Sequence, residues 1–182
     1  MTLIMVEPKY TGLKKVISGG QVGADQGGVA AALALGVDTG GTMPNGFITS
    51  KGPMPHLAEL YGMAEDASAA YPPRTHRNVL DSDGTLIIAS NPNSAGCTLT
   101  RNLAAREGRP YLIIRIRDNP SDIIYEQNTV VNWMVKNRIT VLNVAGNRDR
   151  ADTSHFDATK LLVTSVLIDL KRKGFVTAKM IE

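Results

Sequence analysis

The chain has 182 residues, which is about the length of one domain. Twenty lysines and arginines against 17 aspartates and glutamates give a net charge of +3, too small an excess for a dedicated nucleic-acid-binding protein with a basic stripe. The single cysteine, Cys97, excludes an intramolecular disulfide and a Cys/His zinc site, and no apolar run approaches the about 18 residues of a membrane span. We expect one domain over residues 1–182, with a flexible segment at 1–12, in the cytoplasm and away from membranes.

The first half of the chain predicts one strand and one helix, followed by a long loop. A strand at 14–18 leads through a glycine-rich turn at 19–23 into a helix that reaches Ala34 and stops at Gly36. Glycines and prolines interrupt the chain from Asp38 to Tyr71, so we expect a loop there, with a helical turn at 58–61. A loop of this length inside a compact domain is more often functional than idle.

The second half predicts alternating strands and helices. Short apolar runs at 84–89, 110–116 and 139–144 are typical of buried parallel strands. Helical spacing predicts helices at 98–107 and 157–173, and a third that starts at Ser121 or Asp122 and carries Ile124, Val131, Met134 and Val135. The order indicates an α/β protein, a single Rossmann-like domain with a mostly parallel sheet and helices on both faces.

Polar, glycine-rich turns follow three of these strands. In an open parallel sheet, ligands bind beyond the carboxyl ends of the strands, so these turns are candidate sites. They are SGGQVGAD at 18–25, SNPNSAGCTLT at 90–100 and NVAGNR at 143–148. The first two lead into helices whose free N–H groups suit a phosphate or molybdate-like oxyanion, and Arg148 adds a guanidinium. Each turn alone also fits a tight strand-to-helix connection, and Arg148 a surface arginine.

A further polar stretch, Tyr71 to Gly84, precedes a buried strand and contains two arginines and two aspartates. Asp81 and Asp83 could be paired carboxylates for acid–base chemistry or for a metal. Alternatively, Asp83 begins the strand as part of a turn and Asp81 holds Arg74 or Arg77. The sequence leaves both interpretations open.

Together these motifs resemble those of the molybdenum-cofactor carrier family, within the SLOG superfamily of Rossmann-like nucleotide-ligand proteins. The resemblance runs in order from about Val16 to Arg148. It is carried by SGGQVGAD, the GG-x-x-P-x-G of 40–46, the Y-x-x-RT-x-x-N of 71–78, DSDGTLI at 81–87, the G-x-T-x-T of 96–100 and NVAG at 143–146.

The resemblance implies a soluble homo-oligomer, a dimer or tetramer, that is not an enzyme and holds no metal site of its own. It would bind molybdenum cofactor, a phosphorylated pterin dithiolene (molybdopterin), as cargo, protect it, and deliver it among the enzymes that make or use it. The resemblance assigns binding to Gly19, Gly20, Gln21, Arg74, Thr75, Asn78, Gly96, Thr98 and Thr100. The turns themselves add Ser90, Asn91, Cys97, Gly146 and Arg148 as candidates.

Two alternatives stay open at this point: a nucleotide sensor and an enzyme. Related phosphoribohydrolases, which cleave nucleoside monophosphates, carry PGGxGTxxE where this chain has SAGCTLTRN, so their glutamate is missing and Asn102 is the nearest polar residue. That loss favours binding without hydrolysis unless Asp81 and Asp83 replace the carboxylate. Cys97 stands where the family usually has glycine. It is either a small buried residue or a thiolate whose pKa is lowered by the helix start.

Overall fold

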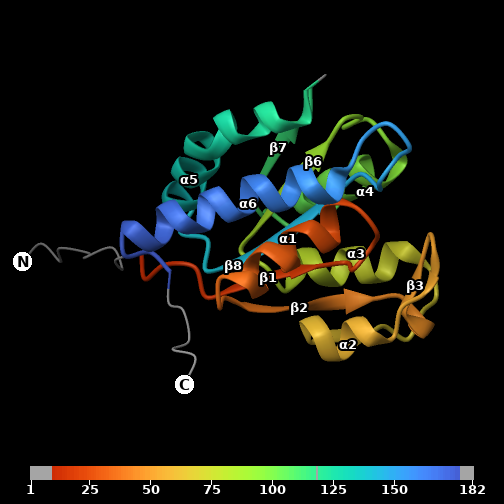
Figure 1. Cartoon of the computed structure of the whole chain (residues 1–182). Coiled ribbons are helices and arrows are strands. Elements are labelled where there is room, and N and C mark those ends of the chain that lie inside the picture. Colours follow the sequence, from red (N-terminus) through yellow and green to blue (C-terminus); the bar gives the residue numbers. More distant parts are fainter. Residues whose placement is uncertain (1–9, 118, 177–182) are drawn as a thin grey trace, which may run out of the picture.

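A six-stranded parallel sheet forms the centre of the molecule in the computed structural model, which describes residues 10–117 and 119–176 (Figure 1). The strand order is β5-β2-β1-β8-β6-β7, and every pairing in it is parallel. The strands are β1 (Lys15–Ser18), β2 (Asp38–Met43), β5 (Met63–Glu65), β6 (Gly84–Ala89), β7 (Tyr111–Arg115) and β8 (Val141–Gly146). This confirms the α/β, Rossmann-like fold class.

Helices cover both faces of the sheet. One face carries α1 (Ala24–Ala34), α5 (Gln127–Lys136) and α6 (His155–Arg172), with α6 packed on both of the others (Figure 1). The other face carries α3 (Tyr71–Leu80) and α4 (Ala95–Arg106), which pack on each other. Because α3 and α4 follow β5 and β6, they border the carboxyl edge of the sheet on one side of it, which is where a ligand is expected.

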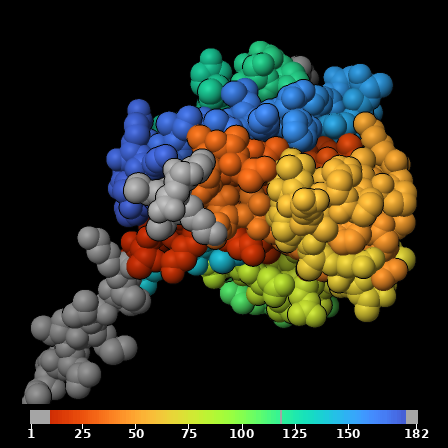
Figure 2. All heavy atoms as spheres, turned by 60° about the horizontal axis from the view of Figure 1, so that its bottom comes forward, coloured from red at the N-terminus to blue at the C-terminus, as the bar shows by residue number. Residues whose placement is uncertain are grey.

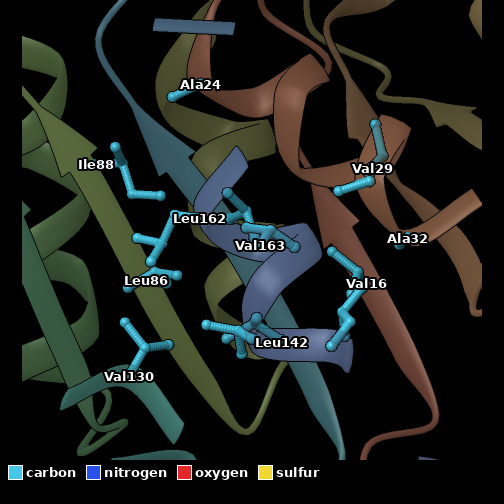
Figure 3. Packing of buried hydrophobic residues seen from close by; sticks show 14 of the residues in the cluster. Val16, Ala24, Val29, Ala32, Leu86, Ile88, Val130, Leu142, Leu162 and Val163 are labelled. Carbon is cyan, nitrogen blue, oxygen red and sulfur yellow. The ribbon is translucent and has the colours of Figure 1, made fainter. Parts of the chain in front are cut away.

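The core lies mainly between the sheet and α1, α5 and α6. Strand β6 is buried along its whole length, since β8 and β7 flank it and helices cover it on both faces. Its side chains alternate, so Leu86 and Ile88 join the main core while Ile87 and Ala89 face the Cys97 side. Figure 3 shows Leu86 and Ile88 beside Leu162 of α6. Burying each such aliphatic side chain contributes about 1.5–3 kcal/mol to folding.

The prediction of a loop from Asp38 to Tyr71 is wrong. Strand β2 lies inside the sheet, between β1 and β5, with Met43 fully buried at its end. Its sequence, DTGGTM, lacks an apolar run, and it is a strand because its backbone pairs on both sides. The rest of the segment forms η1 (Asn45–Phe47), β3 (Ile48–Thr49), β4 (Gly52–Pro53) and α2 (His56–Tyr61), the last of which includes the expected helical turn at 58–61. Figure 2 shows this orange and yellow part on one side of the molecule.

Three helices start at other residues than the sequence predicts, because a capping side chain sets where each one begins. Helix α4 begins at Ala95, a turn before the expected Thr98, because Ser94 Oγ accepts a hydrogen bond from Cys97 N at 3.4 Å. The helix expected from Ser121 or Asp122 begins instead as a 3₁₀ segment, η2 (Pro120–Glu126), capped by Asn119 and continued by α5. Helix α6 starts at His155, two residues early, because Ser154 caps it.

The structure describes only the end of the expected flexible segment at residues 1–12, beginning at Tyr10. Residues 1–9 of the expected flexible segment lie outside the described residues. Tyr10, however, is held in place, since its hydroxyl donates to Ile139 O at 2.8 Å and its ring lies 5.1 Å from that of Phe175. The flexibility expected of residues 1–12 stays a prediction. Among the described helices, none combines the length and apolar character that a membrane crossing requires.

Candidate functional site

A cavity of about 350 Å³ opens between α3 and α4 at the carboxyl edge of the sheet, and we call it the α3–α4 cleft. Its volume falls in the range of small-molecule sites. The lining comes from four places: α3 (Tyr71, Pro72, Arg74, Thr75, Asn78), α4 (Ala95, Gly96, Leu99, Thr100), β8 and the residues after it (Asn143, Ala145, Gly146, Arg148), and the turn after β1 with the start of α1 (Gly19, Gln21, Asp25).

Helix α3 supplies one wall of the cleft, and the sequence-based reading missed it as a helix. Its lining residues lie at spacings of three and four, so they share one face. Prolines stand at the first positions of the helix, where a missing N–H costs nothing. The stretch YPPRTHRN is too polar to predict a helix from hydrophobic periodicity. The paired prolines followed by this spacing are the signal that could have found it.

Arg74 forms a buried ion pair at the inner end of the cleft. Its Nη1 lies 3.4 Å from Asp25 Oδ2, and the two side chains are 11% and 6% exposed. Gly19 makes this pair possible, because a Cβ there would lie 1.4 Å from Arg74 Nη1. Burial raises the pKa of Asp25, while the Arg74 guanidinium and the hydrogen bond from Gln21 N pull that pKa back down. Asp25, which the sequence did not single out, is therefore the partner that orients Arg74.

Most N–H groups of the turn after β1 already have acceptors within the protein. Gly20 N donates to Ser18 Oγ at 3.1 Å, and Val22 N donates to Gln21 Oε1 at 3.1 Å. Ala24 N, at the start of α1, donates to Asn147 O at 3.1 Å. These donors have internal acceptors, so the cradle expected from the glycines is occupied by the protein itself. The turn contributes side chains instead.

The start of α4 is better placed for an oxyanion. The N–H groups of Ala95 and Gly96 belong to the first helical turn, where no intrahelical acceptor exists, and both residues line the cleft. A Cβ on Gly96 would have nothing within 4 Å, so the space beside it is open. The positive end of the helix dipole reinforces these donors.

Two guanidinium groups flank Tyr71 at the cleft. Arg74 Cζ lies 5.6 Å and Arg148 Cζ 5.3 Å from the centre of the Tyr71 ring, within the range of a cation–π contact. Arg77, on the same helix as Arg74, is exposed and does not line the cleft. With Asp25 paired to Arg74, Arg148 leaves the cleft with a net positive charge.

Asn147 joins the loops that border the cleft. Its Oδ1 accepts from Asn91 N at 2.8 Å, and its Nδ2 donates to Ser94 Oγ at 3.0 Å and lies 3.2 Å from Cys97 Sγ. Its backbone N donates to Ile88 O at 3.1 Å. One residue thus fixes the loop after β8 to the start of α4.

Nine of the fourteen candidate residues line the cleft: Gly19, Gln21, Arg74, Thr75, Asn78, Gly96, Thr100, Gly146 and Arg148. In three of the nine, each polar side-chain atom already forms a hydrogen bond within the protein. The hydroxyls of Thr75 and Thr100 donate to helix carbonyls, and the Asn78 amide forms two hydrogen bonds with the backbone of Thr42. These three residues are better described as shaping the cleft than as offering donors to a ligand.

The other five candidates, Gly20, Ser90, Asn91, Cys97 and Thr98, do not line the cleft. Ser90 Oγ lies 2.9 Å from Nε2 of the buried His155. Cys97 is 3% exposed and clusters with Ile87 and Ala89. Burial raises the pKa of the Cys97 thiol, so the expectation of a lowered pKa is wrong and the small-buried-residue interpretation holds.

Asp81 and Asp83 are not paired at the cleft. Asp83 Oδ2 accepts hydrogen bonds from Thr140 N, Thr140 Oγ1 and Val141 N at 2.6 to 2.9 Å, which joins the starts of β6 and β8 at the opposite edge of the sheet. Asp81 is exposed at the end of α3, and Arg74 pairs with Asp25 instead. In the described part of the chain, no group of three or more His, Cys, Asp or Glu side chains is arranged to hold a metal ion.

A parallel α/β sheet with helices on both faces and a cleft at its carboxyl edge defines a Rossmann-like domain. The chain belongs to the circularly permutated YpsA SLOG family, whose model matches residues 16–167. It is similar to a crystal structure from Syntrophus aciditrophicus SB, described as "Putative molybdenum carrier protein", with 35% identity and a TM-score of 0.78 over 86% of this chain and 96% of that one. No curated protein matches the chain. These comparisons confirm the resemblance seen in the sequence.

Proposed function

We propose that this protein binds molybdenum cofactor in the α3–α4 cleft and protects and delivers it without chemical turnover. One observation carries the proposal. Arg74, Arg148 and the first N–H groups of α4, which have no intrahelical acceptor, all line the same cavity. A phosphorylated pterin needs cationic groups and helix N–H donors for its phosphate, and room for its rings. The name of the similar structure supports the same ligand class.

In this proposal the phosphate is held by Ala95 N, Gly96 N and Arg148, and the rings lie deeper, between Leu99 and α3. The hydroxyl groups of the threonines play a smaller part than the sequence motifs suggest, because Thr75 and Thr100 already donate within their helices. Phosphate binding at a helix start uses fixed dipoles, so it needs no rearrangement of the backbone.

Binding without hydrolysis is supported by the carboxylates. Among the described residues that line the cleft, Asp25 is the one carboxylate, and its Oδ2 is engaged by Arg74 and by Gln21 N. Hydrogen bonds from Arg74 and Gln21 already occupy Oδ2, so that oxygen is not free to take a proton from a ligand. Asp81 and Asp83, the other candidates, lie away from the cleft.

The proposal extends to partners and setting. The protein would form a homo-oligomer, a dimer or tetramer, and exchange cofactor with the enzymes that synthesise or use it in the cytoplasm. A monomeric mass by light scattering would remove the oligomer from the proposal.

The test is the identity of the molecules that the protein carries. Protein purified without oxygen is denatured, and the released small molecules are analysed by mass spectrometry together with metal analysis. Pterin and molybdenum in near-equal amounts are the expected result. A nucleotide in their place would make the protein a nucleotide sensor, and a nucleoside monophosphate that is cleaved on incubation would make it a hydrolase.

A further inference from the structure

Three buried side-chain polar atoms on cleft-lining residues have no hydrogen-bond partner. They are Gln21 Nε2, Arg74 Nε and Asn143 Oδ1. Gln21 is 6% exposed and Asn143 2% exposed, so bulk water does not readily satisfy them. An unpaired buried donor or acceptor is costly, and such atoms in a cavity are the ones that a ligand can satisfy.

The orientation of Gln21 follows from its other contacts. Its Oε1 accepts hydrogen bonds from Val22 N at 3.1 Å and from Ser50 N at 2.8 Å. Turning the amide over would set its NH₂ group against two N–H donors. The free end of Gln21 is therefore a donor.

Asn143 presents the complementary group from the floor of the cleft. It lies on β8, and its Nδ2 donates to Thr85 Oγ1 on the neighbouring strand at 3.2 Å. In this amide orientation Oδ1 is the free end, so Asn143 offers an acceptor. The cleft thus contains one donor, on Gln21, that two N–H groups hold in place, and one acceptor, on Asn143, from a different element.

From this pair we propose that the cleft recognises the lactam edge of a bicyclic heteroaromatic ring, in which a ring N–H stands next to a carbonyl. Asn143 Oδ1 accepts the ring N–H, and Gln21 Nε2 donates to the carbonyl oxygen. This inference rests on the proposed function, and it says which end of the cargo enters first. Pterin and guanine share this edge, whereas adenine and 4-aminopteridines present an acceptor nitrogen next to an amino group.

Ligand pairs that differ at this edge alone provide the test. GMP, IMP and AMP carry the same phosphate and sugar, and 6-hydroxymethylpterin and 2,4-diamino-6-hydroxymethylpteridine form a matched pair without phosphate. Binding is measured by calorimetry on the full chain. GMP and IMP are expected to bind with similar affinity and at least tenfold more tightly than AMP, and the pterin at least tenfold more tightly than the diaminopteridine.

The variant Gln21→Glu reverses the donor while keeping an acceptor for Val22 N and Ser50 N. The added negative charge weakens the binding of all three nucleotides alike. The readout is therefore the ratio of GMP affinity to AMP affinity. This ratio should fall to about one or below. Gln26→Glu is the matched control. Gln26 is on α1 and outside the cleft, with Nε2 bonded to Gly20 O at 3.0 Å, and its variant should keep the ratio of the parent.

The outcomes separate this inference from the proposed function. If the pterin binds more tightly than the diaminopteridine, the cleft recognises the lactam edge of the cofactor. If only the nucleotides are discriminated, the cleft recognises the lactam edge of guanine. Both results support lactam recognition. Equal affinity within each pair, or tighter binding of the amino forms, overturns the inference. If molybdenum cofactor nevertheless binds in that case, the proposed function stands, whereas discrimination among nucleotides without any cofactor binding overturns the proposed function and leaves the edge recognition intact.

Discussion

Arg74 Nη1 lies 3.4 Å from Asp25 Oδ2, in a space that any side chain at Gly19 would fill. The two charged residues come from α3 and from the first turn of α1, and they are 49 residues apart in sequence. The pair therefore joins two distant segments at the inner end of the cleft. It also explains why a glycine is needed at position 19, independently of any backbone contact to a phosphate.

Replacing Arg74 should weaken the binding of anionic ligands. Arg74→Ala removes the guanidinium that balances the buried Asp25 carboxylate in the cleft, and a hydrogen bond to a charged group is worth about 1.5–3 kcal/mol, so affinity for molybdenum cofactor should fall at least about tenfold. Arg77→Ala is the matched control, because Arg77 is exposed on the same helix and outside the cleft. Calorimetry on folded protein measures both. Equal losses in the two variants would mean that only the general charge matters.

Gly19→Ala should act through Arg74. The added Cβ displaces the guanidinium from Asp25, so the variant should lose about the same affinity as Arg74→Ala. The double variant should then lose little more than either single one, because both changes remove the same contact. Additive losses in the double-mutant cycle would show that Gly19 has a separate role.

Asp25 should give folding stability an unusual pH dependence. Burial raises its pKa above the ordinary value of 3.8 in the folded state, so the folded protein holds the proton more tightly than the unfolded chain. Its contribution to the free energy of unfolding is therefore fully present below about pH 3.8 and declines as pH rises through the folded pKa. The free energy of unfolding of the parent minus that of Asp25→Asn, measured by urea titration at several pH values, should fall over this range. A difference that rises with pH would contradict the burial argument.

Asp83 should be structural. Asp83→Ala removes three hydrogen bonds at the starts of β6 and β8, at a cost of about 1–3 kcal/mol of stability, with ligand affinity unchanged in the folded protein. Burial alone would raise the pKa of Asp83, but the bonds from Thr140 and Val141 lower it overall, so its stabilisation is lost as pH falls through that pKa. A loss of ligand affinity with little loss of stability would restore the acid–base interpretation.

Asn147 should control access to Cys97. Asn147→Ala removes the contacts to Ser94 and to Cys97 Sγ, and should loosen the start of α4. Cys97 is buried and its pKa is raised, so a thiol reagent should label the parent slowly and the variant several-fold faster. Thr98→Val, half-buried on the same helix and outside the cleft, should leave the labelling rate unchanged.

Local patterns predicted much of the fold and less of the site. The apolar run at Gly84–Ala89 predicted β6 correctly, because burial on both faces leaves a clear pattern in the sequence. Strand β2 was missed because DTGGTM is a strand only through its pairing with β1 and β5. Helix α3 was missed because YPPRTHRN lacks the apolar spacing that marks the other helices. The glycine turns correctly indicated the edge of the sheet. Two features of the site depend on contacts that spacing does not reveal. Most N–H groups of the turn after β1 already have acceptors, and Asp25 forms an ion pair with Arg74.

The most direct test of the central claim is an oxygen-free titration of molybdenum cofactor into the parent protein and into Arg74→Ala. The account predicts near-stoichiometric binding by the parent, recovery of intact cofactor after denaturation, and at least about tenfold weaker binding by the variant. Failure of the parent to bind, conversion of the bound cofactor, or equal affinity in the two proteins would contradict it.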